Sequence, residues 1–138
     1  MLNRNILKEL AETRLREART LLDAACPDGA YYLAGYVIEC GLKAVIAKKT
    51  NRFDFPDKKT VEKSYTHDLS GLVSTAGLQE ELDKEKAASL EFENKWRVVQ
   101  GWTEASRYSM MSQARAKDLF DAISDKKHGV LKWLKRHW

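Results

Sequence analysis

One segment of the sequence carries almost no charge: between Asp28 and Lys43 the only charged side chain is Glu39. The other residues of the segment are aromatic, aliphatic or small, which predicts a helix over 31–49 with Asp28 as its N-cap. At ~1.5 Å per residue such a helix is long enough to cross a small domain or a membrane, but a charged pair at its centre would be costly in lipid. We therefore expect a buried helix at the centre of a small domain.

Polar side chains of this segment recur at helical spacing and share one face: Tyr32, Tyr36, Glu39 and Lys43. Glu39 precedes Lys43 by four residues, the favourable order for a helical ion pair. One interpretation is a buried polar row whose members satisfy one another. The alternative is one wall of a polar cleft, or the seam of a dimer. Gly35 and Gly41 each lower helix stability by about 1 kcal/mol, so we expect another backbone to approach there.

Apolar positions at helical spacing predict four further helices, over 5–25, 66–77, 79–102 and 112–138. The break before the central helix is short, so the first helix should lie antiparallel beside it. Residues 50–66 lack a helical period and predict a loop that Phe53 and Phe55 pin to the body. No strand pattern is present. We expect a single all-α domain over residues 1–138, an up-and-down bundle of four to five helices.

Composition sets the broad class. The chain has 138 residues, 43% of them hydrophobic and 32% charged, as in a folded globular domain. A net charge of +4 fits an anionic partner. Cys26 and Cys40 have no metal-ligand spacing and indicate free thiols in a reducing compartment. The N-terminus has no apolar core of a signal peptide, so we expect a cytoplasmic protein without membrane association.

The C-terminal end is basic. After Asp125 the sequence contains no acidic residue, while five cations accumulate: Lys126, Lys127, Lys132, Lys135 and Arg136. One interpretation is ordinary complementation of the helix dipole. The alternative is a basic end bearing Trp133 and Trp138 that contacts a nucleic-acid backbone.

Common catalytic motifs are absent. The sequence has no glycine-rich phosphate loop, no His-Glu zinc motif, no cysteine cluster and no nucleophile elbow. We therefore expect neither a metal nor a cofactor. Histidine is the residue type that titrates near neutral pH, and the chain contains three: His67, His128 and His137.

Three pieces of the sequence together resemble the HEPN domains, small all-α domains of prokaryotes and some larger eukaryotic proteins. They are YYLAGYVIECGLKAVIAK, SYTHDLSGLV and the run from Trp96 through Trp102 to Arg107-Tyr108, in an order that covers roughly residues 5–136. The resemblance implies a HEPN-like bundle associated with a nucleotide or with RNA. It also implies a homodimer and a minimal nucleotidyltransferase as partner protein, in a toxin–antitoxin or defence context.

Many HEPN domains are metal-independent ribonucleases that use an arginine and a histidine separated by four to six residues. No arginine of this chain has that spacing, and the nearest imitation is Lys132 with His137. The chain thus departs from the usual ribonuclease motif. A looser alternative is a ribonuclease in which His67 is the base and Arg107 stabilises the developing charge.

The resemblance further implies that separate segments converge on the central helix. His67 and Asp68 open one later helix, and Arg107 and Tyr108 precede the last one; they would join Tyr32, Tyr36, Glu39 and Lys43. In the structural interpretation, Glu39 pairs with Lys43 or Arg107 and His67 caps a helix. In the functional one, Arg107, Lys43 and His67 bind a phosphate-bearing ligand. A third interpretation is a non-catalytic interaction module in which the polar stripe of the central helix, Tyr32 to Lys43, forms the dimer seam.

Overall fold

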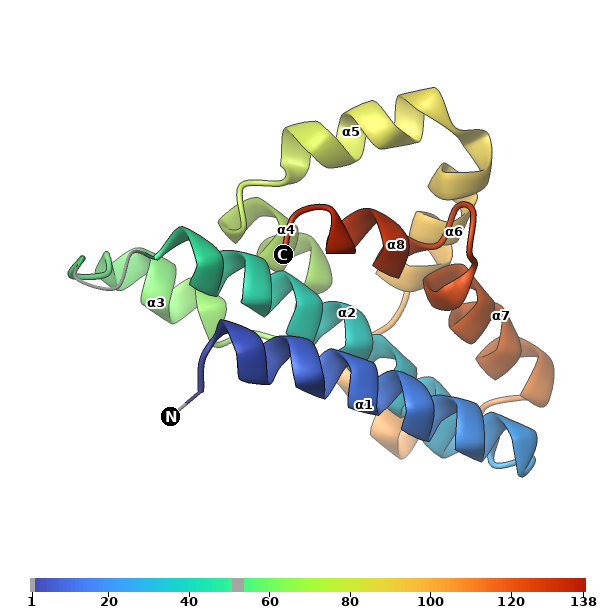
Figure 1. The fold of residues 1–138 in the computed structure, drawn as a ribbon. Helices are drawn as coiled ribbons and strands as arrows, with labels where there is room; N and C mark the ends of the chain where they lie inside the picture. Colours follow the sequence, from blue (N-terminus) through green and yellow to red (C-terminus); the bar gives the residue numbers. More distant parts are fainter. Residues whose placement is uncertain (1, 51–53) are drawn as a thin grey trace.

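The computed structural model describes residues 2–50 and 54–138, and this part of the chain is all-helical, with 75% helix and no strand. The elements, in chain order (Figure 1), are α1 (Arg4–Asp23), α2 (Pro27–Lys49), α3 (Lys58–Ser64), α4 (Leu69–Thr75), α5 (Gln79–Ala88), α6 (Leu90–Gln100), the 3₁₀ helix η1 (Glu104–Tyr108), α7 (Gln113–Ser124) and α8 (Val130–Lys135). The all-α class is confirmed. The expected count of four to five helices is wrong, because the described residues form eight α-helices.

Helix α2 lies at the centre of the molecule. It contacts α1, α4, α7, α8 and η1, and α1 runs antiparallel along it (Figure 1). Its length and composition would also suit a membrane span, but 72% of its most apolar window is buried by the other helices. That burial is expected of a core helix, so the prediction of a buried central helix is confirmed.

The N-terminus of α2 differs from the expectation. Cys26 occupies the N-cap position and Pro27 the first helical position, where its missing N–H is no loss. Asp28 therefore lies inside the first turn, and the N-cap predicted for it is wrong. Its carboxylate instead accepts a hydrogen bond from the backbone N–H of Met111 at 2.6 Å. This bond ties the segment before α7 to the start of the central helix.

Two expected helices are each broken in two. The helix predicted over 79–102 is interrupted at Ser89, whose hydroxyl caps α6. The helix predicted over 112–138 is interrupted after α7, where Asp125 Oδ2 accepts from the backbone N–H of His128 at 2.7 Å. The first break is thus made by a side-chain cap and the second by a turn that the Asp125 side chain stabilises. The apolar period continues across both, so periodicity alone does not reveal them.

The loop expected over 50–66 contains a helix. Helix α3 is capped by Asp57, whose carboxylate accepts from Thr60 N at 3.2 Å, and it buries none of its residues. Phe55 is 99% exposed, so it does not pin this segment, and Phe53 lies outside the described residues. A short helix without a buried face has no apolar period, which is why the pattern predicted a loop.

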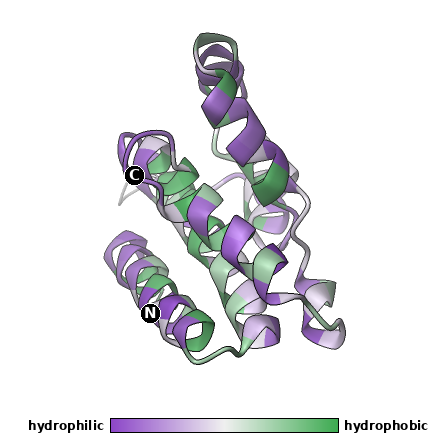
Figure 2. Cartoon of the chain, turned by 90° about the vertical axis from the view of Figure 1, so that its right-hand side faces the viewer, coloured by the Kyte–Doolittle hydropathy of each residue, from purple (hydrophilic) through white to green (hydrophobic). Residues whose placement is uncertain are grey.

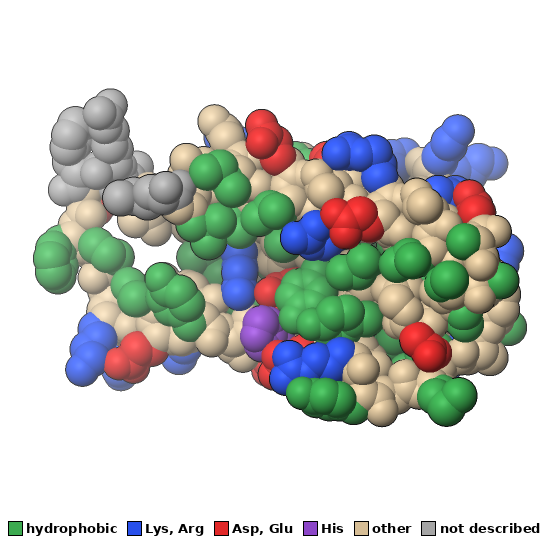
Figure 3. Space-filling model, turned by 90° about the horizontal axis from the view of Figure 1, so that it is seen from below, with side chains coloured by type: hydrophobic (Ala, Val, Ile, Leu, Met, Phe, Trp, Pro, Cys, Tyr) green, Lys and Arg blue, Asp and Glu red, His purple; other side chains and the backbone are tan. Residues whose placement is uncertain are grey.

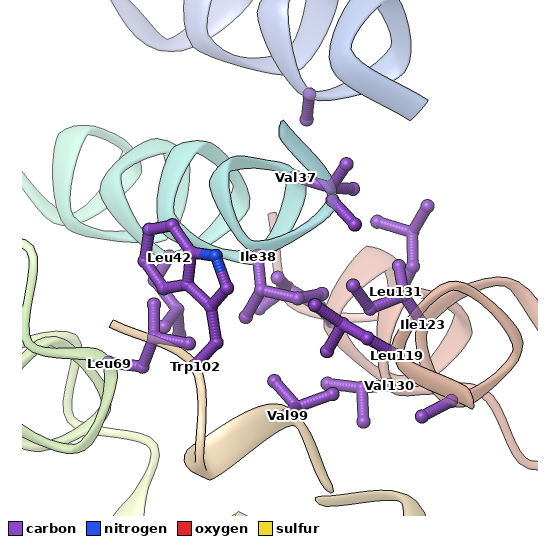
Figure 4. Close-up of a cluster of buried hydrophobic side chains, with 14 of the residues drawn as sticks. Val37, Ile38, Leu42, Leu69, Val99, Trp102, Leu119, Ile123, Val130 and Leu131 are labelled. Carbon is purple, nitrogen blue, oxygen red and sulfur yellow. The ribbon is translucent and has the colours of Figure 1, made fainter. Parts of the chain in front are cut away.

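Hydrophobic sides of the helices turn inward, whereas α5, at the top in Figures 1 and 2, is mostly hydrophilic and buries only Leu82. The indole of Trp102 lies under α2 beside Leu42 (Figure 4), and a Cβ at Gly35 would come within 2.0 Å of it. A Cβ at Gly41 would likewise come within 2.4 Å of the Leu134 side chain. The glycines of α2 thus admit large side chains, not the second backbone that we expected.

Candidate functional site

Glu39 is a buried carboxylate with two partners. Its side chain is 5% exposed, and its Oε2 lies 3.3 Å from Lys43 Nζ, one turn further along α2. Its Oε1 lies 2.7 Å from Nδ1 of His67, which stands two residues before α4. A buried charge requires such partners, because an unpaired one would be strongly destabilising. The predicted Glu39–Lys43 pair is confirmed. His67 does not cap a helix, since Asp68 holds the N-cap position of α4.

His67 has a second carboxylate partner on its other nitrogen. Nε2 lies 3.0 Å from Oε2 of Glu104, on η1, and both side chains are 41% exposed. A neutral imidazole has one N–H, whereas the protonated ring donates from both nitrogens. Both ring nitrogens of His67 face a carboxylate oxygen. Sequence reasoning missed Glu104, although it stands three residues before Arg107 in a segment already singled out.

Two tyrosines of α2 extend the cluster. The hydroxyls of Tyr32 and Tyr36 lie 3.2 Å apart. The ring of Tyr36 packs edge-on against His67, at 5.9 Å between centroids, and against Trp102, at 5.2 Å. Burial, then the hydrogen bond to Tyr32, and the nearby charge of Glu39 raise the pKa of Tyr36 above its ordinary value. Tyr36 therefore stays protonated and holds the ring of His67 from one side.

Arg107 and Tyr108 lie at the other end of the cluster, on η1. A hydrogen bond with the Tyr32 side chain is the main cause that raises the pKa of Arg107 above its ordinary value, followed by Tyr108. The guanidinium lies 4.8 Å from the centre of the Tyr108 ring, and Tyr108 is 81% exposed. Arg107 thus presents its charge at the surface between two aromatic rings.

Most of the predicted site residues come together. We call the following set the α2–η1 cluster: Tyr32, Tyr36, Glu39, Lys43, His67, Glu104, Arg107 and Tyr108. Asp68 lies apart from it. It lines a polar hollow of about 600 Å³ between α3 and α4, together with hydroxyl and lysine side chains such as Thr60 and Lys63.

An open groove adjoins the cluster between α1 and α2. Its volume is about 510 Å³, and its lining combines the Tyr32–Lys43 stripe with apolar side chains that include Leu10 and Leu33. Seen from below the view of Figure 1, the molecule shows hydrophobic side chains beside acidic, basic and histidine side chains (Figure 3). Cys40 also lines the groove, and burial, reinforced by Glu39, raises its pKa to about 11.

The charges of the cluster favour an anion over a metal ion. Among residues 2–50 and 54–138 no group of three or more His, Cys, Asp and Glu side chains is placed to hold a metal. With His67 protonated, three cations (Lys43, His67 and Arg107) face two carboxylates (Glu39 and Glu104), which leaves one positive charge in excess. Arginine binds phosphate through its planar fork and lysine as a point charge.

Two of the five cations of the basic C-terminal end form ion pairs with other helices. Trp133 is only 3% exposed, so it is a core residue and cannot stack on a base as the nucleic-acid interpretation required. Lys135 pairs with Glu12 at 2.7 Å, and Arg136 pairs with Glu85 at 2.9 Å. These ion pairs weaken the nucleic-acid interpretation. Lys132 and Lys135 also lie in the last turn of α8, where the helix-dipole interpretation places cations.

The chain matches no protein-family model, no curated protein and no solved structure. Its function must therefore be inferred from its own residues and their geometry.

Proposed function

We propose that this chain is a HEPN-like helical domain, a nucleotide- or RNA-associated module whose α2–η1 cluster binds a phosphate-bearing ligand. The resemblance of the central helix and of the THDL segment supports the family, with an up-and-down bundle of the HEPN type as its fold. The observation that carries the proposal is the 2.7 Å hydrogen bond from His67 to the buried Glu39. It brings a segment from before α4 onto the polar stripe of α2.

The cluster is preorganised for such a ligand. Glu39 holds two cationic groups at once, Lys43 at 3.3 Å and His67 at 2.7 Å, so neither has to be ordered when a phosphate arrives. Arg107 supplies a third cation at the surface. The exposed ring of Tyr108 beside it offers a face on which a base can stack.

Thermal melts with ATP, GTP and single-stranded RNA test this proposal. A ligand at 100 times its Kd stabilises the native state by ~2.7 kcal/mol, which raises the Tm of a domain of this size by about 9 °C. Arg107→Ala and Lys43→Ala should abolish the shift. Arg97→Ala is the matched control, because Arg97 pairs with Glu93 on the exposed side of α6, and it should keep the shift. No shift with any of the three ligands would overturn the proposal.

A second candidate function is a metal-independent ribonuclease. The Glu39–His67 hydrogen bond is the arrangement in which a carboxylate orients a histidine as general base, and Arg107 would stabilise the developing charge. This candidate requires RNA cleavage in the presence of EDTA that disappears in His67→Ala and in Arg107→Ala. His128→Ala should cleave normally. Cleavage that survives either of the first two substitutions would rule it out.

A third candidate is a non-catalytic dimerisation module. Leu2 and Ile6 of the N-terminal segment are 59% and 38% exposed, and Leu2 lines the groove beside the central stripe. Under this candidate Tyr36→Arg converts a homodimer to a monomer in light scattering, and neither ATP nor RNA shifts the Tm. The resemblance adds the proposals of a nucleotidyltransferase partner protein and of a cytoplasmic toxin–antitoxin or defence role. Co-purification with the product of a neighbouring gene would test that partner.

A further inference from the structure

The nitrogen of His67 that a ligand would reach is already occupied. Nδ1 faces the buried Glu39, so Nε2 is the atom on the solvent side of the ring. Oε2 of Glu104 lies 3.0 Å from it. A phosphate oxygen that approaches His67 must therefore replace the Glu104 carboxylate as hydrogen-bond acceptor.

The segment that carries Glu104 is held incompletely. Helix η1 is a short 3₁₀ helix, a form whose hydrogen bonds are poorly aligned. Ser106, in its middle, is 6% exposed, and its Oγ finds no hydrogen-bond partner in the described part of the chain. The indole Nε1 of Trp102, two residues before η1, is also buried and has no hydrogen-bond partner in the described part of the chain. Unsatisfied buried polar groups make the observed position of η1 less favourable, so its displacement requires less free energy.

Displacement of Glu104 would also change the charge that a ligand meets. With the carboxylate in place, Lys43, Arg107 and the His67 ring face two carboxylates; with it removed, the same three groups face Glu39 alone. Arg107 belongs to the same segment and is tied to Tyr32 on α2. Withdrawal of the Glu104 side chain alone would leave a more positive site in which both His67 and Arg107 are available.

We propose that Glu104 is a built-in competitor for the anion site: it masks Nε2 of His67 until a phosphate group displaces it. The proposal rests on the proposed function, because it takes the α2–η1 cluster to be a phosphate site. Glu104 touches His67 and not the ligand, so it sets affinity through His67.

A ligand-free measurement tests the masking step. Diethyl pyrocarbonate transfers a carbethoxy group to an accessible, unprotonated imidazole nitrogen with loss of carbon dioxide and ethanol. Its rate at His67 is read by peptide mass spectrometry relative to His128 of the same molecule. Glu104→Gln removes the charge but keeps the shape, so modification of His67 should become about three- to five-fold faster, the size expected for loss of a partly exposed ion pair. Glu93→Gln, which breaks the exposed pair with Arg97, should change nothing.

Titration with inorganic pyrophosphate tests the competition step. The Glu104→Gln variant should bind pyrophosphate about three- to five-fold more tightly than the wild-type protein, and Glu93→Gln should bind like wild type. Circular dichroism and the Tm show that each variant is folded.

The outcomes separate the two proposals. A faster modification together with tighter binding supports the competitor role. An unchanged modification rate overturns it, as does an unchanged affinity when the wild type binds pyrophosphate. If neither the wild type nor Glu104→Gln binds pyrophosphate while modification of His67 still accelerates, the proposal of a phosphate site is wrong. The proposal that Glu104 competes with a phosphate is then wrong as well.

Discussion

Glu39→Gln removes the buried charge while keeping the shape of the side chain. Glu39 holds His67 at 2.7 Å and Lys43 at 3.3 Å, and its side chain is 5% exposed. A hydrogen bond to a charged group contributes ~1.5–3 kcal/mol, and removal of one member of a buried pair destabilises by ~3–5 kcal/mol. Lys43 is 20% and His67 41% exposed, so both can turn toward water and the loss falls below that of a fully buried pair. We expect about 2 kcal/mol.

The corresponding Tm shift follows from the length of the chain. An unfolding entropy of ~2.1 cal/mol/K per residue over 138 residues converts about 2 kcal/mol into a decrease of about 7 °C. Chemical denaturation and calorimetry measure both quantities. The matched control is Glu93→Gln, which removes an exposed carboxylate paired with Arg97 at 3.5 Å and should cost no more than ~0.5 kcal/mol.

A double-mutant cycle isolates the contact of Glu39, on α2, with His67, in the segment before α4. Glu39→Gln and His67→Ala should be non-additive by at least ~1 kcal/mol, because each removes the same hydrogen bond. If Glu39→Gln destabilises no more than Glu93→Gln, or if the two substitutions add within ~0.3 kcal/mol, the pair does not hold the start of α4 to α2. The preorganisation on which the proposed function depends would then be refuted.

Two further predictions concern the groove and the core. Gly35→Ala places a methyl group 2.0 Å from the indole of Trp102, so we expect the free energy of unfolding to fall by ~3 kcal/mol and the tryptophan fluorescence to change. Gly101→Ala is the control: its methyl group has no contact closer than 3.4 Å, so it should be neutral in the same denaturation assay. Cys26 is exposed, whereas Cys40 is buried and its pKa is raised to about 11. At pH 8 Ellman's reagent should therefore react with Cys26 at once and with Cys40 only after unfolding. Fast labelling of both thiols would contradict the burial of Cys40.

The central helix and its polar stripe could be predicted because their signal lies within one segment. Within a run that has a single charge, Glu39 has a local partner in Lys43, one turn away. That His67 lies next to the polar stripe of α2 could be predicted only from the resemblance to HEPN domains. Glu104 was missed because no rule of spacing connects residue 104 with residue 67: their contact exists only after η1 and α4 have both packed on α2.

The breaks between helices were missed for a different reason. Ser89 begins α6 through its hydroxyl, and the Asp125 side chain stabilises the turn between α7 and α8, while the apolar residues on both sides keep facing the same core. Periodicity reports which face is buried and does not report continuity of the helix. Gly35 illustrates the same limit: the sequence showed that something approaches closely, but only packing shows that it is the ring of Trp102.

The proposed anion site does not depend on the basic character of the whole chain. The net charge of +4 counts C-terminal cations such as Lys135 and Arg136, which are paired with Glu12 and Glu85 at the surface. The cluster itself carries two carboxylates, so its excess is small and depends on whether His67 is protonated and on where Glu104 lies. A phosphate ligand would therefore respond to a single substitution at Glu104 more strongly than to the removal of any distant lysine, since exposed charges beyond about 8 Å are screened at physiological salt.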